Sequence, residues 1–115
     1  MKLSITHEDG FSIVSILETR LDASLAPDFK AQMEDIISNE NHNIILDISK
    51  LNFMDSSSLG AMVAVYKTLG SKGKLVIFGA SGVVLDLFKL TRMDSVFTIK
   101  DDLNAAKEAF AVETS

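Results

Sequence analysis

The sequence has no cysteine, a single proline and no excess of basic residues. Without cysteine the chain forms neither a disulfide bond nor a thiolate metal site. Its 11 lysine and arginine residues face 16 aspartate and glutamate residues, which gives a net charge of −5. A protein that grips a phosphate backbone needs a basic stripe, and none is visible here. These absences argue against a disulfide-stabilised, thiolate-metal or nucleic-acid-binding protein.

Long apolar runs are also missing. A helix that spans a bilayer needs roughly 18–20 apolar residues, and no segment approaches this length. The opening residues, MKLSITHEDG, carry charges where a secretory signal peptide has its apolar part. We therefore expect a soluble cytoplasmic protein. Its 115 residues, 47% of them hydrophobic, suit one domain spanning 1–115, with residues 112–115 frayed.

Strand-like and helix-like patterns alternate along the chain, without repeats, low-complexity segments or linkers. Two apolar runs around Asp9-Gly10 predict a β-hairpin. Expected strands cover 2–6, 11–17, 43–48, 74–78 and 96–99, and expected helices cover 25–38, 57–70, 82–91 and a segment capped by Asp101 or Asp102. This order predicts an α/β fold with a mixed, mostly parallel sheet, an antiparallel N-terminal edge strand and four helices, packed mainly on one face.

Local signals refine these elements. Ser24 is expected to cap the first helix, and Pro27 falls in its first turn, where a missing N–H costs little. Gly70 is expected near the end of the second helix. The residues expected to be largely buried are Ile45, Leu46, Met62, Val76, Ile77 and Phe88.

Three consecutive serines in FMDSSSLGAMVAVYK, residues 53–67, open the second helix. Functional sites of open α/β sheets gather beyond the carboxyl ends of the strands. A helix N-terminus there has unpaired N–H groups and favours an anion. A hydroxyl at Ser56 or Ser57 therefore fits either a helix cap or a phosphate carrier, and position alone favours the cap.

Other chemical motifs are incomplete. A nucleophile elbow needs G-x-S-x-G, which the residues around Ser56 lack, although His7 and His42 leave a small serine hydrolase as an alternative. The GASG segment, 79–82, lacks the Lys-Ser/Thr of a P-loop and fits a strand-to-helix turn. Asp47 fits a strand-end residue that accepts backbone N–H groups better than a catalytic partner of Asp55. We expect no metal and no cofactor.

The second helix is free of charge from Ser56 to Tyr66. Leu59, Met62, Val63 and Tyr66 are expected on its core side, which leaves Ala61, Ala64, Val65 and Thr68 on the other. A solvated face normally carries lysine and glutamate, so a smooth apolar face suits docking. Burial of the helix on more than one side is the alternative.

The segment NIILDISKLNFMDSSSLGAMVAVYK resembles the signature of the STAS domain, as found in bacterial anti-sigma-factor antagonists. That signature runs from a strand ending in Leu-Asp to Asp-Ser-Ser/Thr-Gly-Leu and an apolar helix. ETRLDASLAPDFK, residues 18–30, also resembles the family where Leu-Asp precedes the first helix, and the element order matches over essentially the whole chain. Ser58 departs from the pattern, since the family has glycine there.

The resemblance implies partner switching without catalysis by this chain. In the family a cognate serine kinase with a histidine-kinase-like ATPase fold phosphorylates the hydroxyl after the motif aspartate and also acts as the sequestering partner. A metal-dependent serine phosphatase removes the phosphate. The phosphorylated position corresponds to Ser56, with Ser57 and Ser58 as lesser candidates. The partner-binding residues implied or expected are Asp22, Asp55, Ser57, Ser58, Ala61, Ala64 and Val65.

A stand-alone STAS subunit of a lipid-transport ABC complex is a second interpretation with the same fold. There the helix docks on the transporter ATPase and needs no phosphate. The retained Asp55-Ser56-Ser57 favours switching. The sequence identifies neither the regulated process nor the kinase.

Overall fold

A computed structural model describes residues 1–39 and 41–111. Five strands form the main sheet in the order β1-β2-β4-β6-β7. Their bounds are β1 Leu3–Glu8, β2 Phe11–Ile16, β4 Asn43–Asp47, β6 Lys74–Phe78 and β7 Thr98–Lys100. The predicted α/β class is confirmed, because β1 pairs antiparallel with β2 at the edge and the other neighbours pair in parallel.

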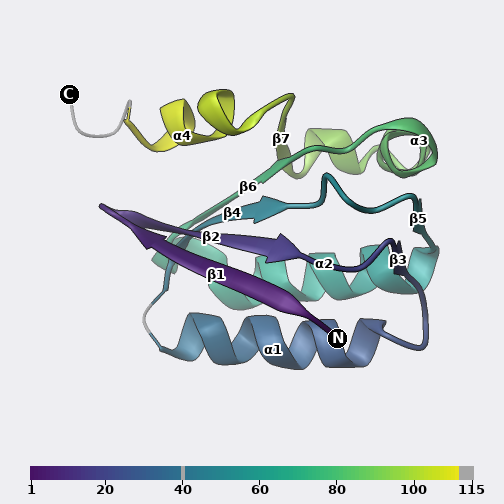
Figure 1. Ribbon diagram of the computed structural model, residues 1–115, viewed down its shortest axis with the longest axis horizontal. Coiled ribbons are helices and arrows are strands. Elements are labelled where there is room, and N and C mark those ends of the chain that lie inside the picture. The colour runs from purple at the N-terminus through teal and green to yellow at the C-terminus, as the bar shows by residue number, and fades with distance from the viewer. Residues whose placement is uncertain (40, 112–115) are drawn as a thin grey trace.

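Four helices alternate with these strands, and helices lie on both sides of the sheet (Figure 1). Their bounds are α1 Ala26–Ser38, α2 Ser56–Leu69, α3 Gly82–Leu90 and α4 Leu103–Ala111. Side chains from α1, α2 and α3 join the larger buried cluster. Ala106 and Phe110 of α4 cover the opposite face, against Ile45 and Val76. None of the helices in the described ranges is long and apolar enough to cross a membrane.

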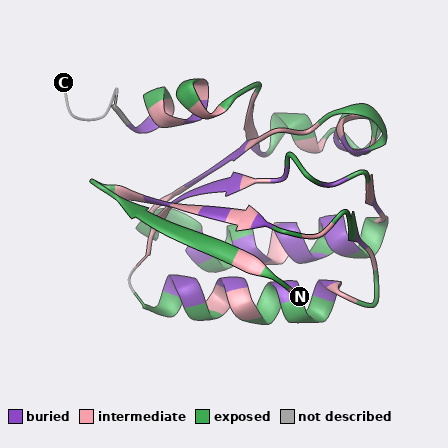
Figure 2. Cartoon of the chain, viewed as in Figure 1, coloured by how far each residue is buried: buried purple, intermediate pink, exposed green. Residues whose placement is uncertain are grey.

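The residues of the central strands β2, β4 and β6 are buried or half-buried (Figure 2). All six residues expected to be buried have at most 1% of their surface exposed, which confirms the expected core: Ile45, Leu46, Met62, Val76, Ile77 and Phe88. The inward side of α1 is the one its helical spacing predicts, with Phe29, Met33, Ile36 and Ile37 buried. Such burial of large aliphatic and aromatic side chains is the main source of stability in a domain of this size.

Turn and cap residues are partly as predicted. Gly10 has φ +90° in the hairpin turn, and Gly70 has φ +54° directly after α2, conformations that glycine adopts without strain. Asp102 accepts a hydrogen bond from the backbone N–H of Ala105 and so caps α4. Ser24 does not cap α1. Its hydroxyl donates to Asp22, and Leu25 at the cap position has no side-chain bond.

The last strand begins later than the predicted 96–99. A short 3-10 helix, Met93–Ser95, comes before it, and Phe97 is buried before β7 begins. The Phe97 ring contacts Tyr66 and Phe88 edge to face, with centroids 5.5 and 5.9 Å away. This packing takes Phe97 out of the strand. The expected fraying of 112–115 concerns residues outside the described part.

Candidate functional site

A second, very small sheet brings two distant loops together. Its strands are β3, Arg20–Leu21, and β5, Phe53–Met54, which pair in parallel. Asn52 also donates its backbone N–H to the carbonyl of Thr19, at 2.7 Å. Because α1 follows β3 and α2 follows β5, the pairing sets the N-termini of both helices side by side at one end of the domain.

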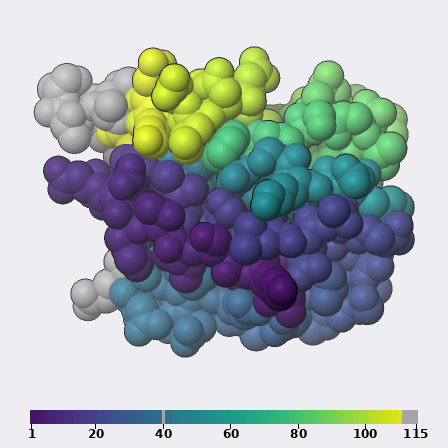
Figure 3. Space-filling model, viewed as in Figure 1, coloured from purple at the N-terminus to yellow at the C-terminus, as the bar shows by residue number. Residues whose placement is uncertain are grey.

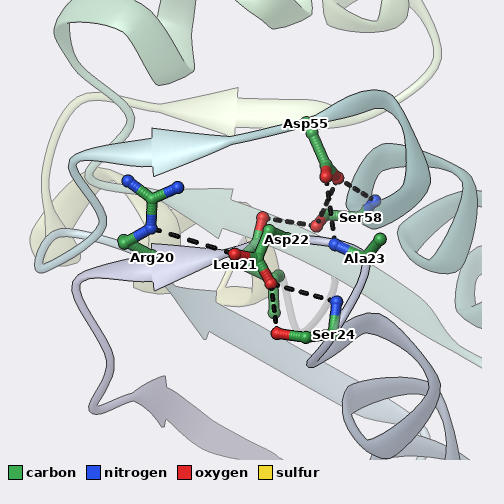
Figure 4. A network of polar contacts seen from close by, with 7 residues as sticks. All are labelled: Arg20, Leu21, Asp22, Ala23, Ser24, Asp55 and Ser58. Carbon is green, nitrogen blue, oxygen red and sulfur yellow. Dashed lines mark hydrogen bonds and ion pairs between the residues drawn. The ribbon is translucent and has the colours of Figure 1, made fainter.

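Asp55 caps α2, in place of the serines. Its Oδ1 accepts a hydrogen bond from the backbone N–H of Ser58 at 3.0 Å. Its Oδ2 accepts another from the backbone N–H of Ala23, also at 3.0 Å, so one carboxylate ties the two loops together (Figure 4). Backbone donation from Ser58 is the main reason that the pKa of Asp55 lies below its usual value, with Ala23 and Ser57 adding to it.

Ser58 is fully buried. Its hydroxyl contacts two acceptors, the backbone carbonyl of Leu21 and Oδ1 of Asp55. It therefore fastens α2 to β3 from inside, and a kinase cannot reach it in this fold. The expectation of Ser58 as an accessible partner contact or phosphate carrier is wrong, because the serine that replaces the family glycine points into the domain.

Ser56 and Ser57 lie differently, at the first two positions of α2, and both are exposed. Residues at the start of a helix have backbone N–H groups without an intrahelical partner. A phosphate on either hydroxyl would therefore face solvent and the positive end of the helix dipole. Both serines are exposed, so accessibility does not decide which of them carries a phosphate.

Asp22 lies beside Asp55, as expected for one surface. Its Oδ1 accepts the hydroxyl and the backbone N–H of Ser24, and these bonds lower the pKa of Asp22. Nε of Arg20 lies 3.8 Å from its Oδ2, while the Arg20 guanidinium stacks over the Phe53 ring at 4.4 Å. The site thus contains two ionised carboxylates and one nearby cation.

The outward face of α2 differs from the expected one. Val65 is 1% exposed and Ala61 is 8% exposed, so their expected accessibility is wrong. Tyr66, expected in the core, is instead 40% exposed. The helix is rotated relative to the prediction, and Ala64 alone of the three expected docking residues is partly exposed.

A shallow groove of about 480 Å³ runs between the first halves of α1 and α2. Its lining is mostly small and apolar, with Lys30 and Ser57 as the polar members: Ala23, Ala26, Pro27, Lys30, Ser57, Gly60, Ala61 and Ala64. A methyl group added at Gly60 would contact nothing within 4 Å. Sequence reasoning missed Ala23, Ala26, Pro27, Lys30 and Gly60, because the groove exists only after β3 and β5 have paired.

The remaining sequence candidates lie elsewhere. His7 and His42 line a polar pocket with Ser12 and Asn41, at the amino end of β4, whereas the serines follow its carboxyl end. Among the described residues neither histidine has a hydrogen bond to Ser56, Ser57 or Ser58, and His7 Nδ1 instead lies 3.1 Å from the hydroxyl of Ser12. Asp47 accepts the backbone N–H of Ser49 at 2.9 Å, as predicted for a strand-end residue.

Comparisons with known proteins address the family and the fold. The family model for the STAS domain matches residues 2–106. An anti-sigma-B factor antagonist from Listeria monocytogenes is 28% identical over 102 residues, which cover 88% of this chain and 90% of that protein. Two solved structures are similar in fold. An anti-sigma factor antagonist from Mycobacterium paratuberculosis has a TM-score of 0.87 and 22% identity, over 96% of this chain and 93% of that one. The Bacillus cell fate determinant SpoIIAA in its phosphorylated form has a TM-score of 0.68 and 16% identity, over 94% and 99%.

Proposed function

This chain belongs to the STAS domain family, and we propose that it works as a partner-switching antagonist controlled by a phosphate on Ser56. In its unphosphorylated form it binds a serine kinase that also acts as an anti-sigma factor. Phosphorylation of Ser56 by that kinase ends the binding, and a metal-dependent phosphatase restores it. The chain itself performs no catalysis.

One observation carries this proposal. Ser56 is exposed and opens α2 directly before Ser57, which lines the apolar groove between α1 and α2. A groove lined by alanine, proline and glycine lets a partner's backbone or apolar side chain approach closely. The relatives' name, anti-sigma-B factor antagonist, supports a protein as the partner.

The charges around Ser56 explain how a phosphate would act. Phosphorylation adds about −1.5 to −2 charges and three acceptor oxygens. Asp55 immediately precedes Ser56, and it lies close enough to Asp22 for its negative charge to oppose the lowering of the pKa of Asp22. The phosphate would thus join two carboxylates and make this rim of the groove strongly negative. An apolar or acidic partner surface would be repelled, while the fold would stay intact because the helix N-terminus accommodates the anion.

The test is site-specific phosphorylation. After incubation with the cognate kinase and ATP, mass spectrometry should find one phosphate, on Ser56. Ser56→Ala should abolish it, whereas Ser57→Ala, the matched variant at the neighbouring exposed serine, should retain it. A phosphate on Ser57, or none on either residue, would refute the assignment.

A further inference from the structure

Among the described residues, no other strand pairs with the outer edge of β1. Leu3–Glu8 forms one end of the main sheet, and five of its six residues, Ser4 to Glu8, are exposed. Figure 3 shows this strand, in dark purple, lying open on the face of the molecule. Native edge strands are protected by shortness, proline, a bulge or a central charge. The opposite edge, β7, is protected by its length of only three residues. β1 has six residues, and those at its centre, Ser4, Ile5 and Thr6, carry no charge.

The outward-facing backbone groups of β1 follow from its pairing with β2. Leu17 donates its N–H to the carbonyl of Lys2, at 3.0 Å. Bonded and non-bonded pairs alternate in an antiparallel ladder. The even-numbered residues Ser4, Thr6 and Glu8 therefore bond to β2, and the N–H and C=O groups of Leu3, Ile5 and His7 point away from the sheet.

We propose that a second copy of this chain pairs with this edge, β1 against β1, antiparallel about a two-fold axis at Ile5. Leu3 then pairs with His7 of the partner subunit, and Ile5 with the partner's Ile5. The two five-stranded sheets become one continuous sheet, an association by strand addition.

Charge complementarity selects this occupant and this register. The outward-facing backbone groups of the two strands can bond only when odd-numbered residues lie opposite odd-numbered residues. The register of the two strands can therefore change only in steps of two residues. When the two-fold axis passes through Ile5, the backbone N–H and C=O groups of all three outward-facing residues of each copy have hydrogen-bond partners. It also sets Lys2 opposite the partner's Glu8 at both ends of the interface. Shifting by two residues either way loses these ion pairs, because Lys2 then faces Thr6 of the partner subunit, or Glu8 faces the partner's Ser4.

Apolar contacts support the same arrangement. Ile5 is 43% exposed and, with Leu3, lines a shallow groove beside α1, completed by Ala31, Gln32, Asp35 and Ile36. The partner's Ile5 would cover part of this surface. The docking groove uses other residues of α1, including Pro27 and Lys30, so it remains open in the dimer. One dimer would present that groove twice.

The first test uses concentration. Sedimentation velocity of the full chain should show a monomer that converts to a dimer as concentration rises. Hydrogen exchange should show the backbone amides of Leu3, Ile5 and His7 becoming protected with concentration, while those of Ser4, Thr6 and Glu8 stay protected throughout. A chain that remains monomeric up to about 1 mM would overturn the proposal. So would hydrogen exchange in which the odd-numbered amides of β1 do not become more protected with concentration.

Charge reversal supplies the second test. In the Lys2→Glu variant two carboxylates lie opposite each other at both ends of the interface. In the Glu8→Lys variant two ammonium groups lie opposite each other there. Each variant should dimerise roughly tenfold more weakly alone, and mixing the two should restore dimers, because the pairs are then complementary. Glu8 also lies 3.6 Å from Lys107 within one chain, but both groups are well exposed, so that pair contributes little. Failure of the mixture to recover, with both variants folded by circular dichroism, would contradict the register.

Discussion

The carboxylate of Asp55 accepts a hydrogen bond from the backbone N–H of Ala23, 32 residues earlier in the chain, at 3.0 Å. The same carboxylate caps α2 through Ser58. Formation of the candidate site and the start of α2 are therefore coupled: whatever loosens Asp55 also separates the two loops that line the groove.

Two replacements of Asp55 should separate the contribution of the Ala23 bond from that of the α2 cap through Ser58. Asp55→Asn keeps a side-chain carbonyl that can accept from Ser58, but its amide nitrogen cannot accept from Ala23. Asp55→Ala loses both bonds. We expect the thermal unfolding midpoint to fall in the order wild type, Asn variant, Ala variant. Equal midpoints for the two variants would mean that the cap through Ser58 has no energetic role, and equal midpoints for wild type and the Asn variant would mean the same of the Ala23 bond.

Acid should destabilise the domain through three carboxylates. The pKa values of Asp22, Asp28 and Asp55 are all lowered in the folded chain, the second mainly through the N-terminal ammonium at 3.0 Å. A lowered folded pKa gives stability that is fully present above the unfolded value, about 3.9, and is lost as pH falls through the folded value. The free energy of unfolding should therefore decline below about pH 4, and Asp55→Asn should show a shallower decline. Urea titrations at several pH values measure this slope.

Ser58→Ala should destabilise the protein without touching its surface. The change leaves the carbonyl of Leu21 without its buried donor, which typically costs about 1–3 kcal/mol. Ser57→Ala is the matched control, because Ser57 is exposed and should change stability by less than about 0.5 kcal/mol. Chemical denaturation of both variants provides the comparison. A harmless Ser58→Ala would mean that the hydroxyl does not fasten α2 to β3.

The groove can be obstructed without damage to the core. Gly60→Ala places a methyl group in open space and should stabilise α2 by about 0.5–1 kcal/mol. Gly60→Glu should likewise fold, yet weaken kinase binding by roughly tenfold or more, since it puts a charge into an apolar docking surface. Val65→Glu, at a buried position, should instead cost several kcal/mol of stability. Melting curves and binding measurements on all three variants distinguish surface from core. Full kinase affinity in Gly60→Glu would exclude the groove as the docking site.

Sequence reasoning identified the main elements because long periodic segments and glycine turns leave clear signals. It missed β3 and β5, which at two residues each are too short to show a period. It also misplaced Ala61, Val65 and Tyr66 around α2, although Leu59 and Met62 are buried as predicted. The helix carries apolar residues almost all round, so polarity did not distinguish Ala61 and Val65 from Tyr66. Tertiary bonds made the choice, with buried Ser58 bound to Leu21 of β3 fixing the rotation. Asp55 and the three serines are all good cap formers, and only the structure shows which one caps.

The most direct test of the proposed switch is the affinity of the kinase for this protein with and without a phosphate on Ser56, measured by isothermal titration calorimetry. We expect the phosphate to weaken binding by about 30- to 1,000-fold, equivalent to roughly 2–4 kcal/mol. Ser56→Ala should bind like the unphosphorylated protein, and Ser56→Asp should fall between the two forms, because a carboxylate has less charge and fewer acceptors than a phosphate. Equal affinity for the phosphorylated and unphosphorylated proteins would contradict the switch and favour the transporter-subunit interpretation.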